Sequence, residues 1–206
     1  EFKATDKITF GVNVLFSNVN QDAYGEGTSY TSPFYSSVSK VSPSDPVYNE
    51  DGSWNQDLIS LGDRNPLLSM TYDRKREYVT RQFNTAWAQY EIIDNLKLKS
   101  TVGYDYQVNK GQNWYDPRTS NGDDYNGLEE DTMYQRKKLV WTNQLTYNHS
   151  WGENHMDYLL GFETDDYSRD YVSAEKQNFA TSDKHDVSNG AVTSGAAGTH
   201  TGTRMV

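Results

Sequence analysis

The feature that most constrains the fold is a pair of long alternating segments within residues 82–108. In the second segment, one parity holds Leu96, Leu98, Val102, Tyr104, Tyr106 and Val108, and the other holds Lys97, Lys99, Thr101, Asp105 and Gln107. A period of two gives a β-strand with one apolar and one polar side. Residues 85–92 alternate in the same way, and the segments meet at Asp94-Asn95, a pair suited to a tight turn. The pattern predicts an antiparallel hairpin.

Three further segments alternate, and together they predict five strands at 8–18, 78–92, 96–108, 133–150 and 155–171. Between them lie polar stretches rich in Gly, Ser, Asn and Pro, which predict long loops at 19–77, 109–132 and 172–206. Short turns join the other strands, at Asp94-Asn95 and at residues 151–154. The connections therefore alternate between long and short.

The arms of the central hairpin run to about a dozen residues, whereas an ordinary strand has about five or six. Strands that cross a bilayer need about 9–11 residues. The polar parity of each segment carries charges and amides that a packed core would not accept unpaired. The fold class is therefore all-β: antiparallel up-and-down strands with long extracellular loops and short periplasmic turns, forming a segment of a transmembrane β-barrel. We expect the parity of Leu98, Val102 and Tyr104 to face lipid.

Composition excludes several other classes. The chain has 206 residues, a formal net charge of −10, 34% hydrophobic residues and 14% aromatic residues. The acidic balance disfavours nucleic acid as a partner, and the aromatic content disfavours disorder. There is no cysteine, so disulfides and thiolate metal sites are excluded. The sequence contains no run of about 18 apolar residues, so it predicts no transmembrane helix.

The sequence offers no catalytic or cofactor motif. It contains no GxSxG elbow, P-loop, HExxH or GxGxxG pattern, so we expect neither an enzyme nor a cofactor. The four histidines are scattered without metal-ligand spacing, which predicts no metal site. A cluster of oxygen-donor side chains in one predicted loop could suit calcium; its members are Asn121, Asp123, Asp124 and Asn126. The cluster lacks the EF-hand spacing and is better interpreted as a solvated turn.

Aromatic side chains in the predicted loops are the candidates for ligand binding. Flat rings beside charged groups can stack on a sugar or pack on a peptide while the charges fix its orientation. The candidates are Trp54, Trp114, Tyr115, Asp116, Arg118 and Tyr125. The alternative for each of them is that it packs one loop against another.

Several phrases, in order, resemble a known family. They are NPLL (65–68), FNTAWAQYEIIDNLKLKSTVGYDY (83–106) and HMDYLLGFE (155–163), and the passages ITFGVNVLFSN and SPFYSSVSKVSPSDPVYNEDGSW fit the same pattern. Together they cover nearly the whole chain and resemble the barrel of the SusC-like TonB-dependent transporters. The resemblance implies a location in the cell outer membrane and a part in nutrient uptake, with an oligosaccharide or a peptide as cargo.

The same resemblance implies which partners to expect. They are the remaining barrel strands and the plug of the transporter, a SusD-like surface lipoprotein, the TonB complex and the lipid of the outer membrane. We find no plug domain, TonB box or signal peptide in these residues, and we interpret the chain as an internal barrel piece. The competing hypothesis is a soluble secreted all-β glycan-binding module, which would need a dry core between two sheets.

Overall fold

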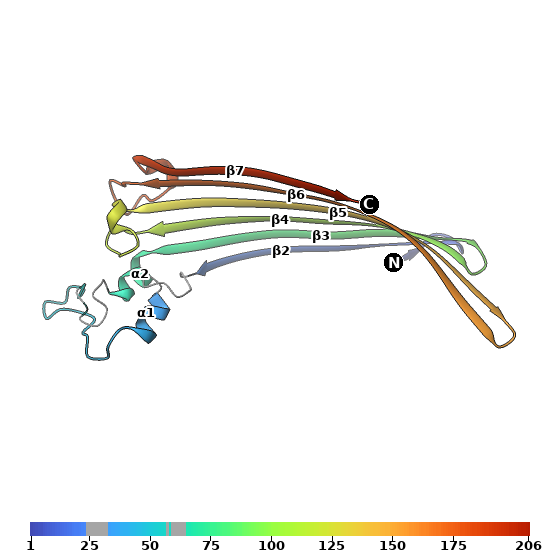
Figure 1. Ribbon diagram of the computed structural model, residues 1–206, viewed down its shortest axis with the longest axis horizontal. Coiled ribbons are helices and arrows are strands. Elements are labelled where there is room, and N and C mark those ends of the chain that lie inside the picture. Colours follow the sequence, from blue (N-terminus) through green and yellow to red (C-terminus); the bar gives the residue numbers. More distant parts are fainter. Residues whose placement is uncertain (24–32, 57, 59–64) are drawn as a thin grey trace.

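The computed structural model describes residues 1–206 except 24–32, 57 and 59–64, and its main feature is one sheet of long strands (Figure 1). Each strand pairs antiparallel with its sequence neighbours, so the order across the sheet is β1 to β7. Two helices and two 3-10 turns lie in the connections, and none of the described helices is long and apolar enough to cross a membrane. The elements are β1 (Phe2–Lys3), β2 (Ile8–Ala23), α1 (Pro33–Ser39), α2 (Pro66–Tyr72), β3 (Arg74–Ile93), β4 (Leu96–Tyr115), η1 (Asp123–Tyr125), β5 (Leu128–Trp151), β6 (Asn154–Gln177), η2 (Val187–Asn189) and β7 (Val192–Met205).

All five predicted strands are present, and each is longer than its alternating pattern. β3 and β4 have 20 residues each, and β5 and β6 have 24 each. The extra length takes up much of the predicted loops 109–132 and 172–206, leaving connections at 116–127 and 178–191. Of the predicted loop 19–77, residues 24–32, 57 and 59–64 lie outside the described part. The extensions are polar on both faces, so the period-two signal fades there.

β7 corrects the prediction that residues 172–206 form a loop. It pairs with β6 from Val192 opposite Gln177 to Met205 opposite Asp165. Its sequence, VTSGAAGTHTGTRM, consists mainly of small and polar residues and has no apolar face. Strand formation here comes from hydrogen bonding to β6, which leaves no trace in hydrophobic periodicity.

One face of the sheet carries an exposed apolar belt that crosses β2 to β6. Directly paired residues form its rows, for example Ile8, Tyr90, Leu98, Leu145 and Leu160. Val14 is 73% exposed and Leu160 is 71% exposed, so the belt has no protein cover among the described residues. A soluble sandwich would bury such a face beneath a second sheet, and the described strands form one sheet. The second sheet that the soluble-module hypothesis needs is absent from the described residues, and the belt lies on the parity of Leu98, Val102 and Tyr104.

The belt drifts along the strands as it crosses the sheet. On β2 it spans Ile8 to Phe16 and centres on Val12, whose register leads to Thr164 on β6. On β6 the belt spans Met156 to Phe162 and centres on residue 159, five residues before Thr164 and four strands away from β2. This drift of about one residue per strand gives a tilt of about 35–40°, because residues rise about 3.3 Å and strands lie about 4.8 Å apart. Membrane barrels have tilts of about 35–45°.

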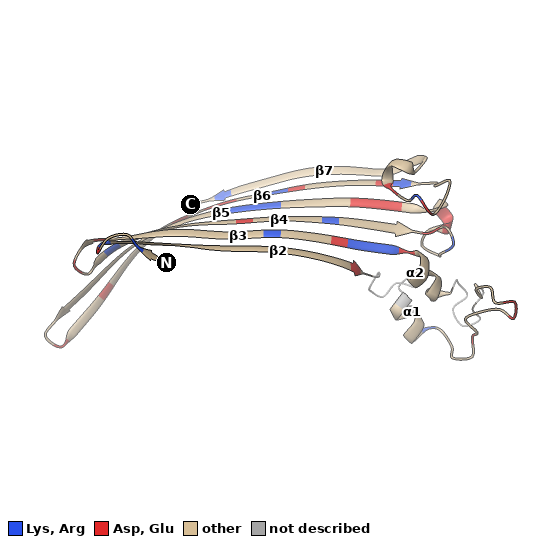
Figure 2. Ribbon diagram, turned by 180° about the vertical axis from the view of Figure 1, so that it is seen from behind, with Lys and Arg blue, Asp and Glu red and all other residues tan. Residues whose placement is uncertain are grey.

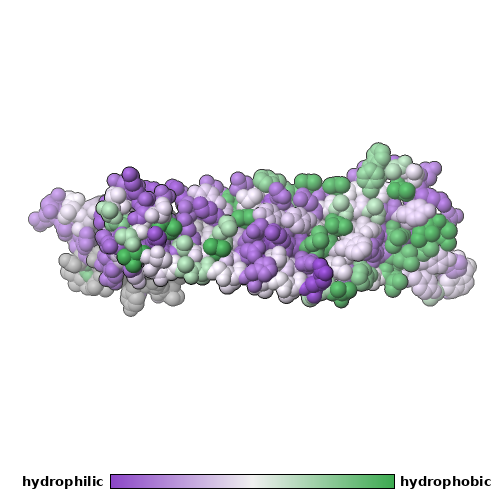
Figure 3. All heavy atoms as spheres, turned by 90° about the horizontal axis from the view of Figure 1, so that it is seen from above, coloured by the Kyte–Doolittle hydropathy of each residue, from purple (hydrophilic) through white to green (hydrophobic). Residues whose placement is uncertain are grey.

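The two ends of the sheet differ in chemistry. Both short turns lie at one end, where Asn95 (φ 67°) and Gly152 (φ 58°) adopt the left-handed conformation that tight turns need. The helices and longer connections lie at the other end, called here the loop end (Figure 1). Charged residues gather toward the loop end of β3 and β5 (Figure 2), and apolar side chains gather toward the turn end (Figure 3). The candidate ligand-binding residues therefore all lie at the polar end.

Candidate functional site

A carboxylate at the start of β3 ties two connections together at the loop end. Asp73 Oδ1 accepts hydrogen bonds from the backbone N–H of Asp116 (2.9 Å) and the hydroxyl of Thr119 (2.8 Å). Its Oδ2 accepts one from Asn121 Nδ2 (2.9 Å). Burial raises the pKa of Asp73, and these donors oppose the rise by stabilising the charged form. The connection 116–127 is therefore fixed to the C-terminal cap of α2.

Two of the predicted site residues bond each other. Arg118 donates to both carboxylate oxygens of Asp116, at 2.7 Å from Nε and 2.8 Å from the terminal nitrogen. Burial alone raises the pKa of Asp116, but the hydrogen bonds from Arg118 outweigh it and hold that pKa below its ordinary value. The guanidinium of Arg118 lies 3.6 Å from the centre of the Tyr72 ring, whose hydroxyl accepts from Trp54 Nε1 (3.2 Å). Trp54, Asp116 and Arg118 therefore belong to one packed network.

Trp114 is the anchor of the connection 178–191. It is 2% exposed, with Phe179 edge-on at 4.9 Å between ring centroids and His185 stacked at 4.9 Å. Gly127 adopts φ 85°, and a Cβ there would lie 2.7 Å from the Trp114 ring. For Trp114 the structure therefore shows the alternative weighed from sequence, in which the ring packs loops together. Phe179 and His185 carry no sequence signal that distinguishes them from other loop residues.

The predicted residues differ in how much surface they offer a ligand. Tyr125 is 46% exposed, and the side chain of Arg118 is 51% exposed. Tyr115 is half-buried, and this burial raises the pKa of its phenol. Asp116 is 1% exposed, so it offers a ligand almost no surface of its own.

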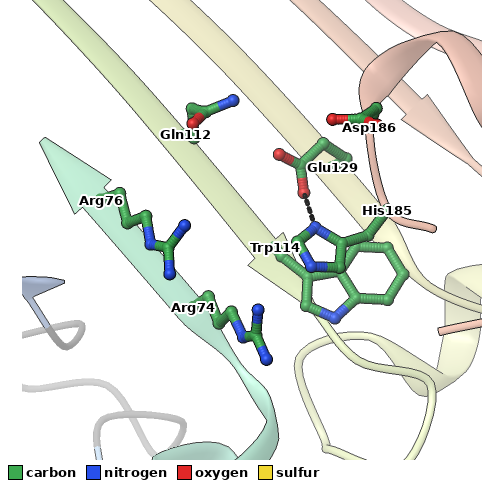
Figure 4. A pocket seen from close by; sticks show the side chains of 7 residues that line it. All are labelled: Arg74, Arg76, Gln112, Trp114, Glu129, His185 and Asp186. Atoms are coloured by element: carbon green, nitrogen blue, oxygen red, sulfur yellow. Dashed lines mark ion pairs between the residues drawn. The ribbon is translucent and has the colours of Figure 1, made fainter. Parts of the chain in front are cut away.

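A small cavity of about 100 Å³ opens beside Trp114 (Figure 4). Arg74 and Arg76 lie on one side of it, and Glu129 and His185 lie on the other. Burial, followed by the charges of Asp131 and Asp186, raises the pKa of Glu129 to about 8. Burial, followed by the charge of Arg74, lowers the pKa of His185. At neutral pH both groups are therefore uncharged, and the 3.7 Å approach of His185 Nδ1 to Glu129 Oε2 is not an ion pair.

The face opposite the belt carries most of the charged and amide side chains of the strands, with a few exposed apolar residues among them, such as Leu15, Phe83 and Leu159. Arg81 bonds both oxygens of Asp105, at 2.9 and 2.6 Å, and Lys138 bonds Asp165 at 2.7 Å. These side chains lie on the parity that the sequence assigned to the polar side. Within the described part of the chain, no group of three or more His, Asp or Glu side chains could hold a metal ion.

Comparison with known proteins identifies what such a two-faced sheet belongs to. No family model matches the chain. The TonB-dependent receptor P3 of Formosa agariphila is 27% identical over 204 residues, covering 92% of this chain and 20% of the relative. The TonB-dependent receptor P26 of the same organism is 24% identical over 166 residues, covering 78% of this chain and 16% of the relative. The chain is homologous to a segment of the TonB-dependent receptors.

Solved structures match the fold of the segment. The RagAB peptide transporter superposes with a TM-score of 0.75 at 17% identity, covering 98% of this chain and 23% of that chain. The RagAB peptide importer in its open-open and closed-closed states gives a TM-score of 0.72 in each case. The sheet therefore has the architecture of part of a TonB-dependent receptor barrel. The chain spans about a fifth of the length of the curated relatives it matches.

The homology confirms the resemblance inferred from the sequence. TonB-dependent receptors are transporters of the outer membrane rather than enzymes, and this chain is part of such a barrel. The apolar belt then faces lipid, and the polar face lines the lumen. The short turns are periplasmic, and the loop end is extracellular.

Proposed function

We propose that the chain forms part of the wall and extracellular mouth of a nutrient importer that takes up an oligosaccharide or a peptide. The observation that carries the proposal is the height of the sheet above the lipid belt. On β4 the belt ends at Tyr104, and residues 105–115 continue the strand. At about 3.3 Å per residue and a tilt of about 40°, this extension rises roughly 30 Å beyond the bilayer. Such a wall encloses a deep polar vestibule in which an oligomer can be held.

Cargo capture in the outer mouth supports the same proposal. Tyr125 and Arg118 present an exposed aromatic ring and a guanidinium on the connection 116–127, which Asp73 fixes to the end of α2. An exposed ring and a fixed charge on one connection suit stacking on a sugar or a peptide group. We include Tyr115 and Trp54 as contacts at the edge of this surface. Weak individual contacts suffice, because an importer must release what it captures.

The remaining partners belong to the proposal as well. The plug and the other barrel strands of the full-length receptor supply the closed pore, and the TonB complex supplies the energy that moves the plug. A SusD-like lipoprotein closes the extracellular mouth over the bound cargo. The matched RagAB structures are described as a peptide transporter and a peptide importer, which favours a peptide as the first cargo to try.

Uptake by cells with and without the full-length receptor tests this function. Cells that carry the receptor should deplete a mixture of oligopeptides and oligosaccharides from the medium more quickly than a deletion strain, as read by mass spectrometry. Dissipating the proton gradient should abolish the difference, because the plug would no longer be moved. Equal depletion by the two strains, or a difference that survives loss of the gradient, contradicts the proposal.

A further inference from the structure

A row of arginines crosses the lumenal face just outside the lipid belt. Strand register aligns Arg81 on β3, Gln107 on β4, Arg136 on β5 and Arg169 on β6. All four share the lumenal parity of Asp105 and Lys138, which occupy the neighbouring row. The row lies on the extracellular side of the belt on each strand, because Ala86, Leu139 and Phe162 all precede it on the way from the turns. It therefore lies where a cargo must pass from the vestibule into the barrel.

Arg136 and Arg169 occupy directly opposite positions on adjacent strands. Like charges placed directly opposite each other destabilise a sheet, since their Cβ atoms lie only about 4.5–5.5 Å apart. Both side chains are exposed on the lumenal face, so neither is held there by packing in a core. The repulsion between Arg136 and Arg169 opposes folding of the empty barrel. This cost indicates that the two arginines have a role in binding a ligand that neutralises them.

The nearby carboxylates are already engaged by other cations. Asp105 takes both of its hydrogen bonds from Arg81, and Asp165 takes one from Lys138. Arg136 feels the charge of Asp105 but forms no hydrogen bond or ion pair with any described residue. Arg169 lies over the Tyr134 ring at 4.8 Å, and it too forms no ion pair within the described ranges. Arg81 and Lys138 therefore engage Asp105 and Asp165, and Arg136 and Arg169 are left without a carboxylate partner among the described residues, although the chain as a whole carries a net charge of −10.

Aromatic rings border the same row on its extracellular side. Tyr134 and Tyr171 are directly paired on β5 and β6, with ring centroids 4.5 Å apart. The Arg169 guanidinium lies over the Tyr134 ring of this pair, a contact that orients the guanidinium while leaving its N–H groups available to a ligand. A planar guanidinium donates two parallel hydrogen bonds to a carboxylate and is the side chain best matched to that group.

We propose that Arg136 and Arg169, flanked by Arg81 and Tyr134, bind a carboxylate group on the cargo. The receptor is therefore selective for acidic oligomers, whether the carboxylate belongs to a peptide or to a uronic acid. This inference rests on the proposed import function and narrows its substrate class. A bound carboxylate neutralises the repulsion between the two arginines, so the row in the empty barrel favours binding of an anion.

The test measures binding of paired probes to the purified full-length receptor by calorimetry. One pair is tetraglutamate and tetraglutamine, both acetylated at the N-terminus and amidated at the C-terminus so that only the side chains differ in charge, and the other is tetragalacturonate and its methyl ester. At least one acidic probe should bind, with its neutral counterpart bound at least about tenfold more weakly, which is the scale of one charge-assisted hydrogen bond. The pair that responds identifies the peptide or the sugar source. Added salt should weaken binding of the acidic probe.

Variants assign the effect to the row. Arg136→Gln and Arg169→Gln should each weaken binding of the acidic probe by about tenfold to a hundredfold. Lys137→Gln is the matched control: it removes the same charge from the next residue of β5, which points to the opposite face. It should leave binding unchanged. Heat-modifiability on a gel confirms that each barrel is folded.

Three results overturn the proposal: no acidic probe binds, the neutral partners bind as tightly, or both arginine variants bind like the parent. Receptor-dependent uptake of neutral oligomers as fast as of acidic ones by cells carrying the parent receptor would leave the import function standing and remove the acidic selectivity. Absence of receptor-dependent uptake of every probe by the same cells would instead contradict the import function itself. The two failures are therefore distinguishable.

Discussion

At the scale of single residues, Glu129 links protonation to the packing of connection 178–191 against Trp114. We call this packed connection the rim; the rim is closed when it packs on Trp114 and opened when it does not. Its carboxyl is buried next to Trp114 and His185, and Oε2 has no hydrogen-bond partner among the described atoms. Its pKa is raised from 4.5 to about 8, chiefly by burial. The closed rim therefore keeps the proton over a pH range in which an opened rim would lose it. The packing of connection 178–191 must weaken as pH rises toward 8.

Glu129→Gln should remove this pH dependence. Between pH 6.5 and about 8 the carboxyl of an opened rim is already ionised while the closed form still holds its proton, so the free energy of opening falls as pH rises. Above about 8 the fall should end. The glutamine variant cannot ionise and should be flat across the window. The readout is the fluorescence of Trp114, taken as the difference between each protein and the same protein carrying Trp114→Phe.

Glu130→Gln serves as the control, because residue 130 lies on the opposite face of β5. It should keep the pH dependence of the parent. The account of the rim is wrong if the parent is flat between pH 6.5 and 8, or if Glu129→Gln retains the slope.

At the scale of elements, the sequence predicts strands where one face meets lipid and the other meets water. Residues 96–104 alternate cleanly because the bilayer demands it. Beyond the belt both faces are wet, so residues 109–115 and all of β7 carry no such constraint, and their sequences predict loops. The packing around Trp114 is harder to predict from sequence than the strands are. Trp114 could be recognised as a loop aromatic, but its burial depends on Phe179 and His185, which are distant in sequence.

The lumenal arginine row shows a second limit of the sequence. Arg81, Arg136 and Arg169 are each ordinary polar-face residues in their own strand patterns. Their alignment depends on the register of β3 to β6, which the short turns at Asp94-Asn95 and at residues 151–154 fix for β3 with β4 and for β5 with β6, but not for β4 with β5. Sequence could assign the correct face to each arginine but could not place them in one row.

Adjacent substitutions on β4 test the assignment of its two faces. Val102 lies within the apolar belt, and Thr101 points to the lumen. Val102→Arg should destabilise the folded barrel by about 2–4 kcal/mol, the cost of a charge on the lipid face near the bilayer centre, whereas Thr101→Arg should cost much less. Folding of the full-length receptor into lipid vesicles at graded urea concentrations measures both. Equal costs, or a larger cost for Thr101→Arg, would show that the faces are reversed.

At the scale of the whole molecule, the sheet is an open piece of a larger barrel. β2 to β7 follow one another without crossover. The belt tilts across them, and the polar face rises well beyond it on the extracellular side. The homology to a segment of the TonB-dependent receptors accounts for all of these features, because their remaining strands close the barrel. The central claim is that this sheet separates lipid from an aqueous lumen.

Spin-label accessibility along β4 tests that claim most directly. Single cysteines at positions 97–104 of the full-length receptor, labelled and reconstituted in lipid, should alternate in their collisions with oxygen, which is enriched in lipid, and with a water-soluble nickel reagent. Labels replacing Leu98, Val102 and Tyr104 should favour oxygen, and labels replacing Lys97, Lys99 and Thr101 should favour the nickel reagent. A period of two with this phase supports a barrel wall. Uniform access to the nickel reagent, or alternation with the opposite phase, would contradict it.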